Sequence, residues 1–168
     1  MTNPLPTRIP SLGPRGVGWV ALQGICFALI AAAIAAGPPE ARDDPAATGT
    51  RHLVGYMIGM IGAVFIGSGF AELRRAHALT VLPQPLADAE LVERGAYRFV
   101  RHPIYSGLIL GAIGLAVITP WAGTFIAAAL LTIVLDLKRR REEAWLAERF
   151  PGYTAYRSRT KALVPFLY

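Results

Sequence analysis

Long apolar runs alternate with short polar segments along the chain, and this pattern predicts membrane-spanning helices. The runs at 17–36 and 53–73 each have about the 20 residues that an α-helix needs to cross ~30 Å of hydrocarbon. A third run, 104–137, is interrupted only at 119–123 and predicts a tight hairpin of two shorter helices. The expected fold is an all-α integral membrane bundle with about four transmembrane helices.

Helix-breaking residues set the expected boundaries. Four prolines in residues 1–16 predict an extended leader, and Thr119 followed by Pro120 predicts the N-cap and first residue of the fourth helix. The mixed-polarity stretch 86–100 predicts a short amphipathic segment at the membrane surface. No linker is evident, so we expect a single membrane domain, 1–168. It divides into a leader with two spans, 1–85, and a hairpin with a cytosolic tail, 86–168.

Composition supports this assignment. The chain is 54% hydrophobic and 17% charged with a mean hydropathy of +0.42, whereas soluble domains average about 25% charged residues. A net charge of +6 could indicate a nucleic-acid partner, but the basic residues are concentrated at the ends of the apolar runs. We therefore expect no nucleic-acid partner. The single cysteine, Cys26, excludes an intramolecular disulfide, and no metal site is predicted.

The distribution of basic residues predicts the topology. Fifteen of the seventeen Lys and Arg residues lie in the leader, in segment 74–103 or after residue 137, and only Arg42 and Arg51 lie elsewhere. The positive-inside rule then places both termini in the cytoplasm, for a protein of the inner (cytoplasmic) membrane.

A polar heptapeptide, Arg101 to Gly107 (RHPIYSG), stands at the start of the third helix. Pro103 suits a first helical position, and the exposed amides of that turn lie at the positive end of the helix dipole. Arg101 and His102 would lie beside this end and could bind a carboxylate or phosphate. Tyr105 adds a phenol, and Gly107 allows close approach.

A pair of carboxylates, Glu142 and Glu143, follows at the cytosolic end of the fourth helix. Adjacent residues lie about 100° apart on a helix, so one could face a ligand while the other pairs with Lys138 or Arg139. Taken singly, these groups also fit topogenic charges and a solvated helix face. Their combination at one membrane depth favours a single site for a zwitterion or a cationic cofactor with a carboxylate tail.

Segment 95–107, the apolar hairpin, the Glu-Glu pair and the tail 150–157 together resemble the isoprenylcysteine carboxyl methyltransferase and phospholipid methyltransferase superfamily. The resemblance covers roughly residues 90–165. It implies a site for S-adenosylmethionine, with S-adenosylhomocysteine as product, at the cytosolic membrane face. The implied cofactor-binding residues are Tyr97, Arg98, His102, Pro103, Tyr105, Gly107, Glu142 and Glu143, and the implied catalytic residues are Arg101, Glu142 and Glu143.

The activity implied is methyl transfer to a lipophilic acceptor: a prenyl-cysteine-like carboxylate, a phospholipid amine or another apolar small molecule. Membrane lipid is an expected partner. The pair Gly55 and Gly59 predicts close helix packing, at the edge of a sideways substrate route or in a homo-oligomer.

Two other classes of protein are alternatives to a methyltransferase. An NADPH-dependent membrane reductase of the steroid-reductase type shares Arg-His-Pro-x-Tyr but has an acidic residue where this chain has Leu108, and a non-catalytic four-helix protein would place ionisable groups within its spans.

Overall fold

The computed structural model describes residues 9–38 and 45–165, and the regular secondary structure within them is helical, with one isolated bridge between Val100 and Lys161. The predicted all-α fold is confirmed. The helices are α1 (Val17–Ala36), α2 (Pro45–Arg75), α3 (Pro103–Ile118), α4 (Ala122–Arg149) and α5 (Tyr153–Arg159), with 3-10 turns η1 (Pro14–Gly16) and η3 (Gly95–Arg98). The start of the leader (1–8), the loop 39–44 with Arg42, and 166–168 lie outside the described residues.

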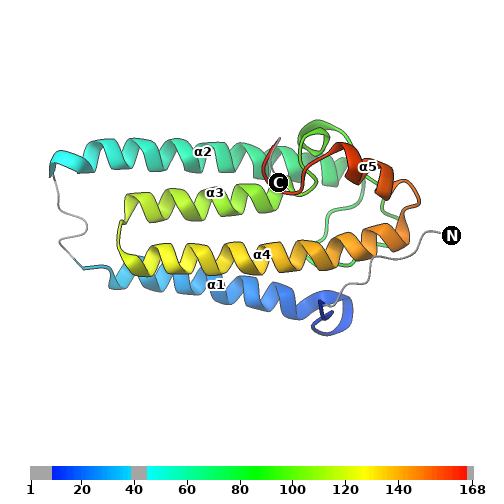
Figure 1. The fold of residues 1–168 in the computed structure, drawn as a ribbon, viewed down its shortest axis with the longest axis horizontal. Coiled ribbons are helices and arrows are strands. Elements are labelled where there is room, and N and C mark those ends of the chain that lie inside the picture. The colour runs from blue at the N-terminus through cyan, green and yellow to red at the C-terminus, as the bar shows by residue number, and fades with distance from the viewer. Residues whose placement is uncertain (1–8, 39–44, 166–168) are drawn as a thin grey trace.

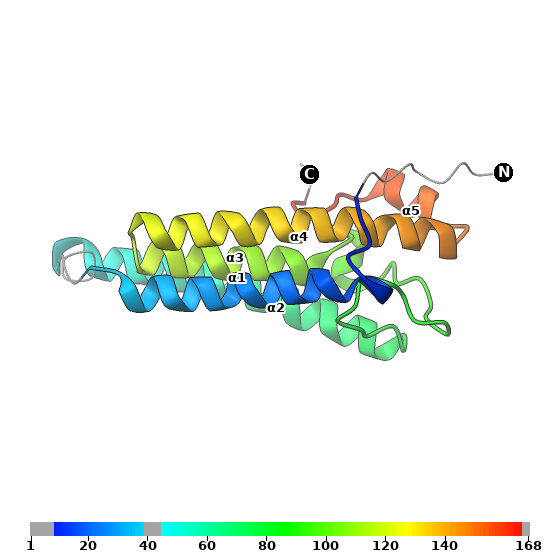
Figure 2. The same cartoon turned by 90° about the horizontal axis from the view of Figure 1, so that it is seen from below.

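Four long helices lie along one axis, and their order in space differs from their order in sequence. In Figure 1, α2 lies on α3, α3 on α4, and α4 on α1. One end of the bundle brings together the C-terminal ends of α2 and α4, the start of α3, and the short elements η3 and α5, as Figure 2 also shows. That arrangement brings the heptapeptide and the Glu-Glu pair together.

The sides of the bundle are those of a membrane protein. Segments Pro14–Ala36 and Thr48–Arg75 are long and apolar enough to cross a bilayer, while Pro103–Ile118 is shorter. Large apolar side chains remain exposed along α1, α2 and α4, among them Ile25, Phe27, Met57, Met60, Val64 and Ile126. Lipid is the solvent that such a surface fits. Four crossings stay a prediction.

The contact between α2 and α3 depends on glycines spaced by seven residues. A Cβ atom added to Gly62 would lie 2.7 Å from the Gly107 carbonyl oxygen, and one added to Gly55 would lie 2.7 Å from that of Gly114. The helices therefore touch backbone to backbone. Gly59, predicted to act with Gly55, has open space at its own Cβ position. Helix α3 of the same chain therefore covers α2 at Gly55 and Gly62, while a sideways substrate route and a homo-oligomer stay predictions.

The predicted start of the fourth helix was wrong. Helix α4 begins at Ala122 after Trp121, because Thr119 ends α3 and the Thr124 hydroxyl donates hydrogen bonds to the carbonyls of Thr119 and Trp121. The predicted amphipathic segment 86–100 is helical only in η3.

The reason for the irregular segment is its packing. Val92 and Ala89 are buried against the bundle end, and the Arg94 guanidinium pairs with the Glu72 carboxylate at 2.8 Å. At Gly95 the backbone takes φ +59°, which turns the chain into η3. The segment is thus a cover over the bundle end.

Candidate functional site

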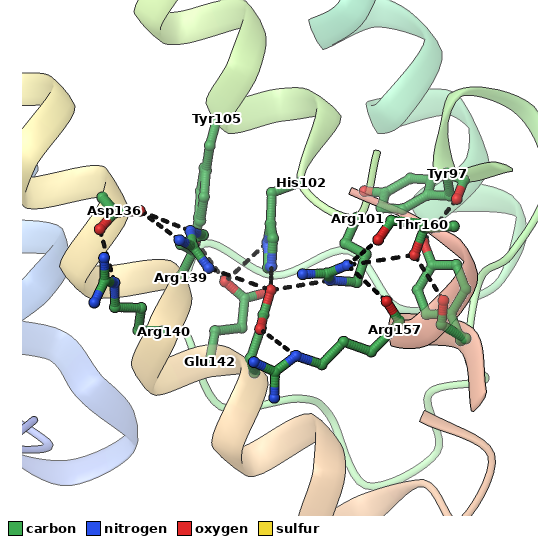
Figure 3. A network of polar contacts seen from close by, with 12 residues as sticks. Tyr97, Arg101, His102, Tyr105, Asp136, Arg139, Arg140, Glu142, Arg157 and Thr160 are labelled. Atoms are coloured by element: carbon green, nitrogen blue, oxygen red, sulfur yellow. Dashed lines mark hydrogen bonds and ion pairs between the residues drawn. The ribbon is translucent and has the colours of Figure 1, made fainter. Parts of the chain in front are cut away.

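Glu143 is the buried centre of the polar network at this end of the bundle. Its carboxylate accepts a hydrogen bond from Arg101 Nε at 3.0 Å and lies 3.2 Å from His102 Nε2. The guanidinium groups of Arg139 and Arg157 approach it at 3.6 Å and 3.5 Å. Figure 3 shows these groups converging from α3, α4 and the C-terminal segment. Arg101 and His102, predicted to bind a ligand's anion, thus bind a carboxylate of their own chain.

The environment of Glu143 keeps it ionised. Burial acts to raise the pKa of its carboxyl, but the hydrogen bonds and charges of His102 and Arg101 outweigh burial and lower that pKa to about 2. The buried Glu143 carboxylate thus connects α4 with the residues just before α3 and with α5.

We expect this pairing to make stability depend on pH. Because the folded pKa of Glu143 lies below the unfolded value of about 4.5, the stabilisation is complete above pH ~4.5 and declines as the pH falls toward 2. The shift corresponds to about 3 kcal/mol. Thermal unfolding in a non-ionic detergent, measured between pH 7 and pH 3, should show a steeper acid loss for the wild type than for Glu143→Gln. Parallel profiles would contradict the assignment.

Glu142 points in a different direction, as its place on the helix predicts. Its carboxylate accepts a hydrogen bond from the Tyr105 hydroxyl at 2.7 Å and lies 4.0 Å from His102 Nδ1. The rings of His102 and Tyr105 stack with centroids 5.4 Å apart. Because Glu142 is only partly buried and contacts fewer cations than Glu143, it is the carboxylate available to a ligand.

The C-terminal segment holds the heptapeptide in place. The amides of Arg101 and His102 donate to the carbonyls of Lys161 and Ala162, at 2.8 Å and 3.1 Å. The Ser106 hydroxyl donates to the Leu163 carbonyl at 2.6 Å. The start of α3 is therefore fixed by residues about 60 positions later in the chain.

A cavity of about 550 Å³ opens beside this network. That volume lies within the ~300–1,000 Å³ usual for small-molecule sites. Its polar end carries side chains of the predicted site, namely Tyr97, Arg101, His102, Tyr105 and Glu142. Its apolar lining includes Val20, Phe70, Leu73, Ile104, Leu108 and Leu146. Residues 78–92 form a cover segment over this cavity. Side chains of α1, α2, α3 and α4 all contribute to its lining.

The other predicted site residues have different places. Pro103 is buried as the first residue of α3, and Gly107 lies against Gly62 of α2; neither lines the cavity. Arg98 is exposed in η3 and does not line it either. Glu143 stands behind the cavity wall and positions Arg101 and His102.

Sequence reasoning did not assign Tyr153, Lys138 and Gln23 to the site, yet all three line the cavity. The Tyr153 side chain is 1% exposed, and its hydroxyl has no hydrogen-bond partner among the residues that the structure describes. Burial and the nearby Glu143 charge raise the pKa of this phenol, so it remains a neutral donor. A glutamine within the first apolar run was the available sequence signal for Gln23.

The sequence pattern of the phospholipid methyltransferase family matches residues 50–152, which is more than half of the chain and includes the heptapeptide and both glutamates. The chain belongs to the phospholipid methyltransferase family.

Similar proteins outside this chain include isoprenylcysteine methyltransferases and metal-resistance proteins. Over 112 residues the chain is 27% identical to a protein-S-isoprenylcysteine O-methyltransferase of Schizosaccharomyces pombe, which covers 64% of the chain and 46% of the relative. Over 78 residues it is 36% identical to the cobalt-zinc-cadmium resistance protein CzcN of Cupriavidus metallidurans, which covers 46% of the chain and 36% of the relative. The chain thus spans less than half the length of either. No solved structure matches it.

Proposed function

We propose that this member of the phospholipid methyltransferase family transfers a methyl group from S-adenosylmethionine to a lipophilic acceptor. The reaction takes place at the cytosolic face of the inner membrane, with both termini in the cytoplasm. The observation that carries the proposal is the cavity that joins a polar end, at Glu142 and His102, to an apolar lining from four helices. Membership of the family supports the reaction type.

The residues present fit S-adenosylmethionine. The free Tyr153 hydroxyl offers a buried donor, and Glu142 offers a carboxylate suited to a cationic group. These side chains with His102 would hold the polar groups of the cofactor, and Phe70 and Leu108 would contact the acceptor chain. When bound, the cofactor supplies an activated methyl group, which leaves its sulfonium sulfur as the acceptor nucleophile forms the new bond and the sulfur keeps the electron pair.

The protein's own contribution is alignment, exclusion of water and, for some acceptors, removal of a proton. A carboxylate acceptor releases no proton. An amine or hydroxyl acceptor does, and Glu142 and His102, which both line the cavity beside the proposed cofactor site, are the candidate bases. Arg101 and Glu143 form an ion pair with one another. We therefore assign both a positioning role: they hold His102 and the start of α3 in place.

Replacing Glu142 by glutamine should weaken S-adenosylhomocysteine binding by about 10- to 100-fold, since a hydrogen bond to a charged group contributes ~1.5–3 kcal/mol. Calorimetric titration of the detergent-solubilised protein measures this change. Glu148→Gln, on the exposed side of the same helix, is the matched control and should bind as the wild type does. Equal affinities for all three proteins would remove Glu142 from the site.

The test of function is to incubate membranes containing the protein with S-adenosylmethionine labelled in its methyl group and to identify the extracted lipid that gains label. Stabilisation of the purified protein by S-adenosylhomocysteine should accompany it. Stabilisation by NADPH alone would instead support a reductase. Binding of S-adenosylhomocysteine without turnover on any lipid or prenyl-thiol would support a non-catalytic role.

A further inference from the structure

Lys138 is a buried cation inside the cavity. Its residue exposure is 3%, and it lies on α4 one helical turn before Glu142. The ammonium donates hydrogen bonds to Gln23 Oε1 at 2.7 Å and to the Val81 carbonyl at 3.3 Å. Both acceptors are neutral. Among the residues that the structure describes, no carboxylate lies within 4.0 Å of this ammonium.

An ammonium without a carboxylate in ion-pair contact is unusual at such depth, because burial of an unpaired charge is costly. The charge of Glu142, one helical turn on, acts on it from beyond 4.0 Å. The neighbouring buried cations do have carboxylate partners: Arg139 pairs with Asp136 at 2.7 Å, and Arg101 pairs with Glu143 at 3.0 Å. Two protein acceptors leave one of the three ammonium N–H groups for another partner. The ammonium also lies 5.2 Å from the centre of the Tyr105 ring, which places it beside the residue that contacts Glu142.

The choice of lysine is itself informative. The chain has fifteen arginines and only two lysines, and the other lysine, Lys161, has an exposed side chain. A lysine ammonium is a compact point charge, whereas arginine is preferred for planar ion pairs of the kind that surround Glu143. Lys138 therefore differs from the structural cations of the site in chemistry as well as in pairing.

We propose that Lys138 binds an anionic group, carboxylate or phosphate, on the lipophilic acceptor. The ammonium lies in the same cavity as Glu142 and as the apolar side chains of Phe70, Leu73 and Leu108. An acceptor with its anion on Lys138 keeps its apolar chain against that lining and its head beside the proposed cofactor residues. This inference rests on the proposed function and narrows the acceptor to molecules with an anionic head.

A purely structural lysine is the competing explanation, since Lys138 links α1, α4 and the cover segment through Gln23 and Val81. Such a link would affect all ligands equally. Discrimination between an anion and its neutral analogue is the property that only a binding role predicts.

The experiment uses the full chain in a neutral maltoside detergent and two fluorescent probes, cis-parinaric acid and its methyl ester. The wild type should bind the acid at least about tenfold more tightly than the ester, in line with a charge-assisted hydrogen bond. Lys138→Met should abolish that preference while leaving the ester affinity unchanged. Lys161→Met should behave as the wild type. Displacement of the acid by palmitate or by hexadecyl phosphate tells whether carboxylate or phosphate is the better head.

Equal binding of acid and ester to the wild type would overturn the proposal without any variant, and so would an acid preference that survives in Lys138→Met. Stabilisation of the wild type by S-adenosylhomocysteine is measured in the same samples. If that stabilisation is present and the acid preference is absent, only the role of Lys138 fails. If S-adenosylhomocysteine does not bind, the proposed function fails.

Discussion

Replacing Glu143 by alanine should destabilise the protein by about 3–5 kcal/mol and abolish most activity. The substitution leaves the Arg101 guanidinium, whose side chain is 8% exposed, without its carboxylate, and removes the partner of His102 Nε2. Breaking a buried ion pair by removing one member costs this much because the other charge stays buried. Displacement of His102 by about 1 Å would lower the methyl-transfer rate by about 100-fold.

Thermal unfolding in detergent and transfer of labelled methyl groups measure the two effects. Glu148→Ala removes an exposed carboxylate from the same helix and should change the unfolding free energy by less than ~0.5 kcal/mol. Glu143→Gln keeps an oxygen that can accept a hydrogen bond from Arg101. Its unfolding free energy should therefore lie between those of Glu143→Ala and Glu148→Ala. If Glu143→Ala were as stable as Glu148→Ala, the network around Glu143 would not hold this end of the bundle together.

The meeting of the heptapeptide with the glutamates could be predicted from the sequence. A helical hairpin returns the chain to its starting side, so residues at the two ends of run 104–137 meet whatever the packing details. The divergence of Glu142 and Glu143 likewise follows from helix geometry. Which of the two faces the cavity depends on the rotation of α4, which is set by its contacts with α1 and α3.

Helix neighbours could not be predicted, because helices that are apolar on every side have no periodic stripe to indicate a packing face. The order in space places α1 on α4 and α2 on α3, although α1 and α2 are consecutive. The link from Lys138 to Gln23 depends on that order. The cover segment depends on that order too. Its mixed polarity predicted an amphipathic segment at the membrane surface, and its buried Val92 shows that it packs on the bundle end as a loop.

Replacing Gly62 by alanine should separate α2 from α3 and lower stability by about 1–3 kcal/mol, the usual cost of overpacking. The added Cβ would lie 2.7 Å from the Gly107 carbonyl oxygen and 3.2 Å from the Gly111 amide nitrogen. Backbone atoms cannot rotate away as a side chain can, so one helix must move. Gly62→Leu should cost more, and because α3 begins at the site, it should also weaken S-adenosylhomocysteine binding.

Gly59→Ala and Gly67→Ala are the matched controls, since their Cβ atoms meet nothing within 4 Å on the same helix. Helix propensity alone would make them neutral or stabilising by about 0.5–1 kcal/mol. Thermal unfolding of the four variants in one detergent separates the two groups. Equal stability of Gly62→Ala and Gly59→Ala would mean that α2 and α3 do not touch through their backbones.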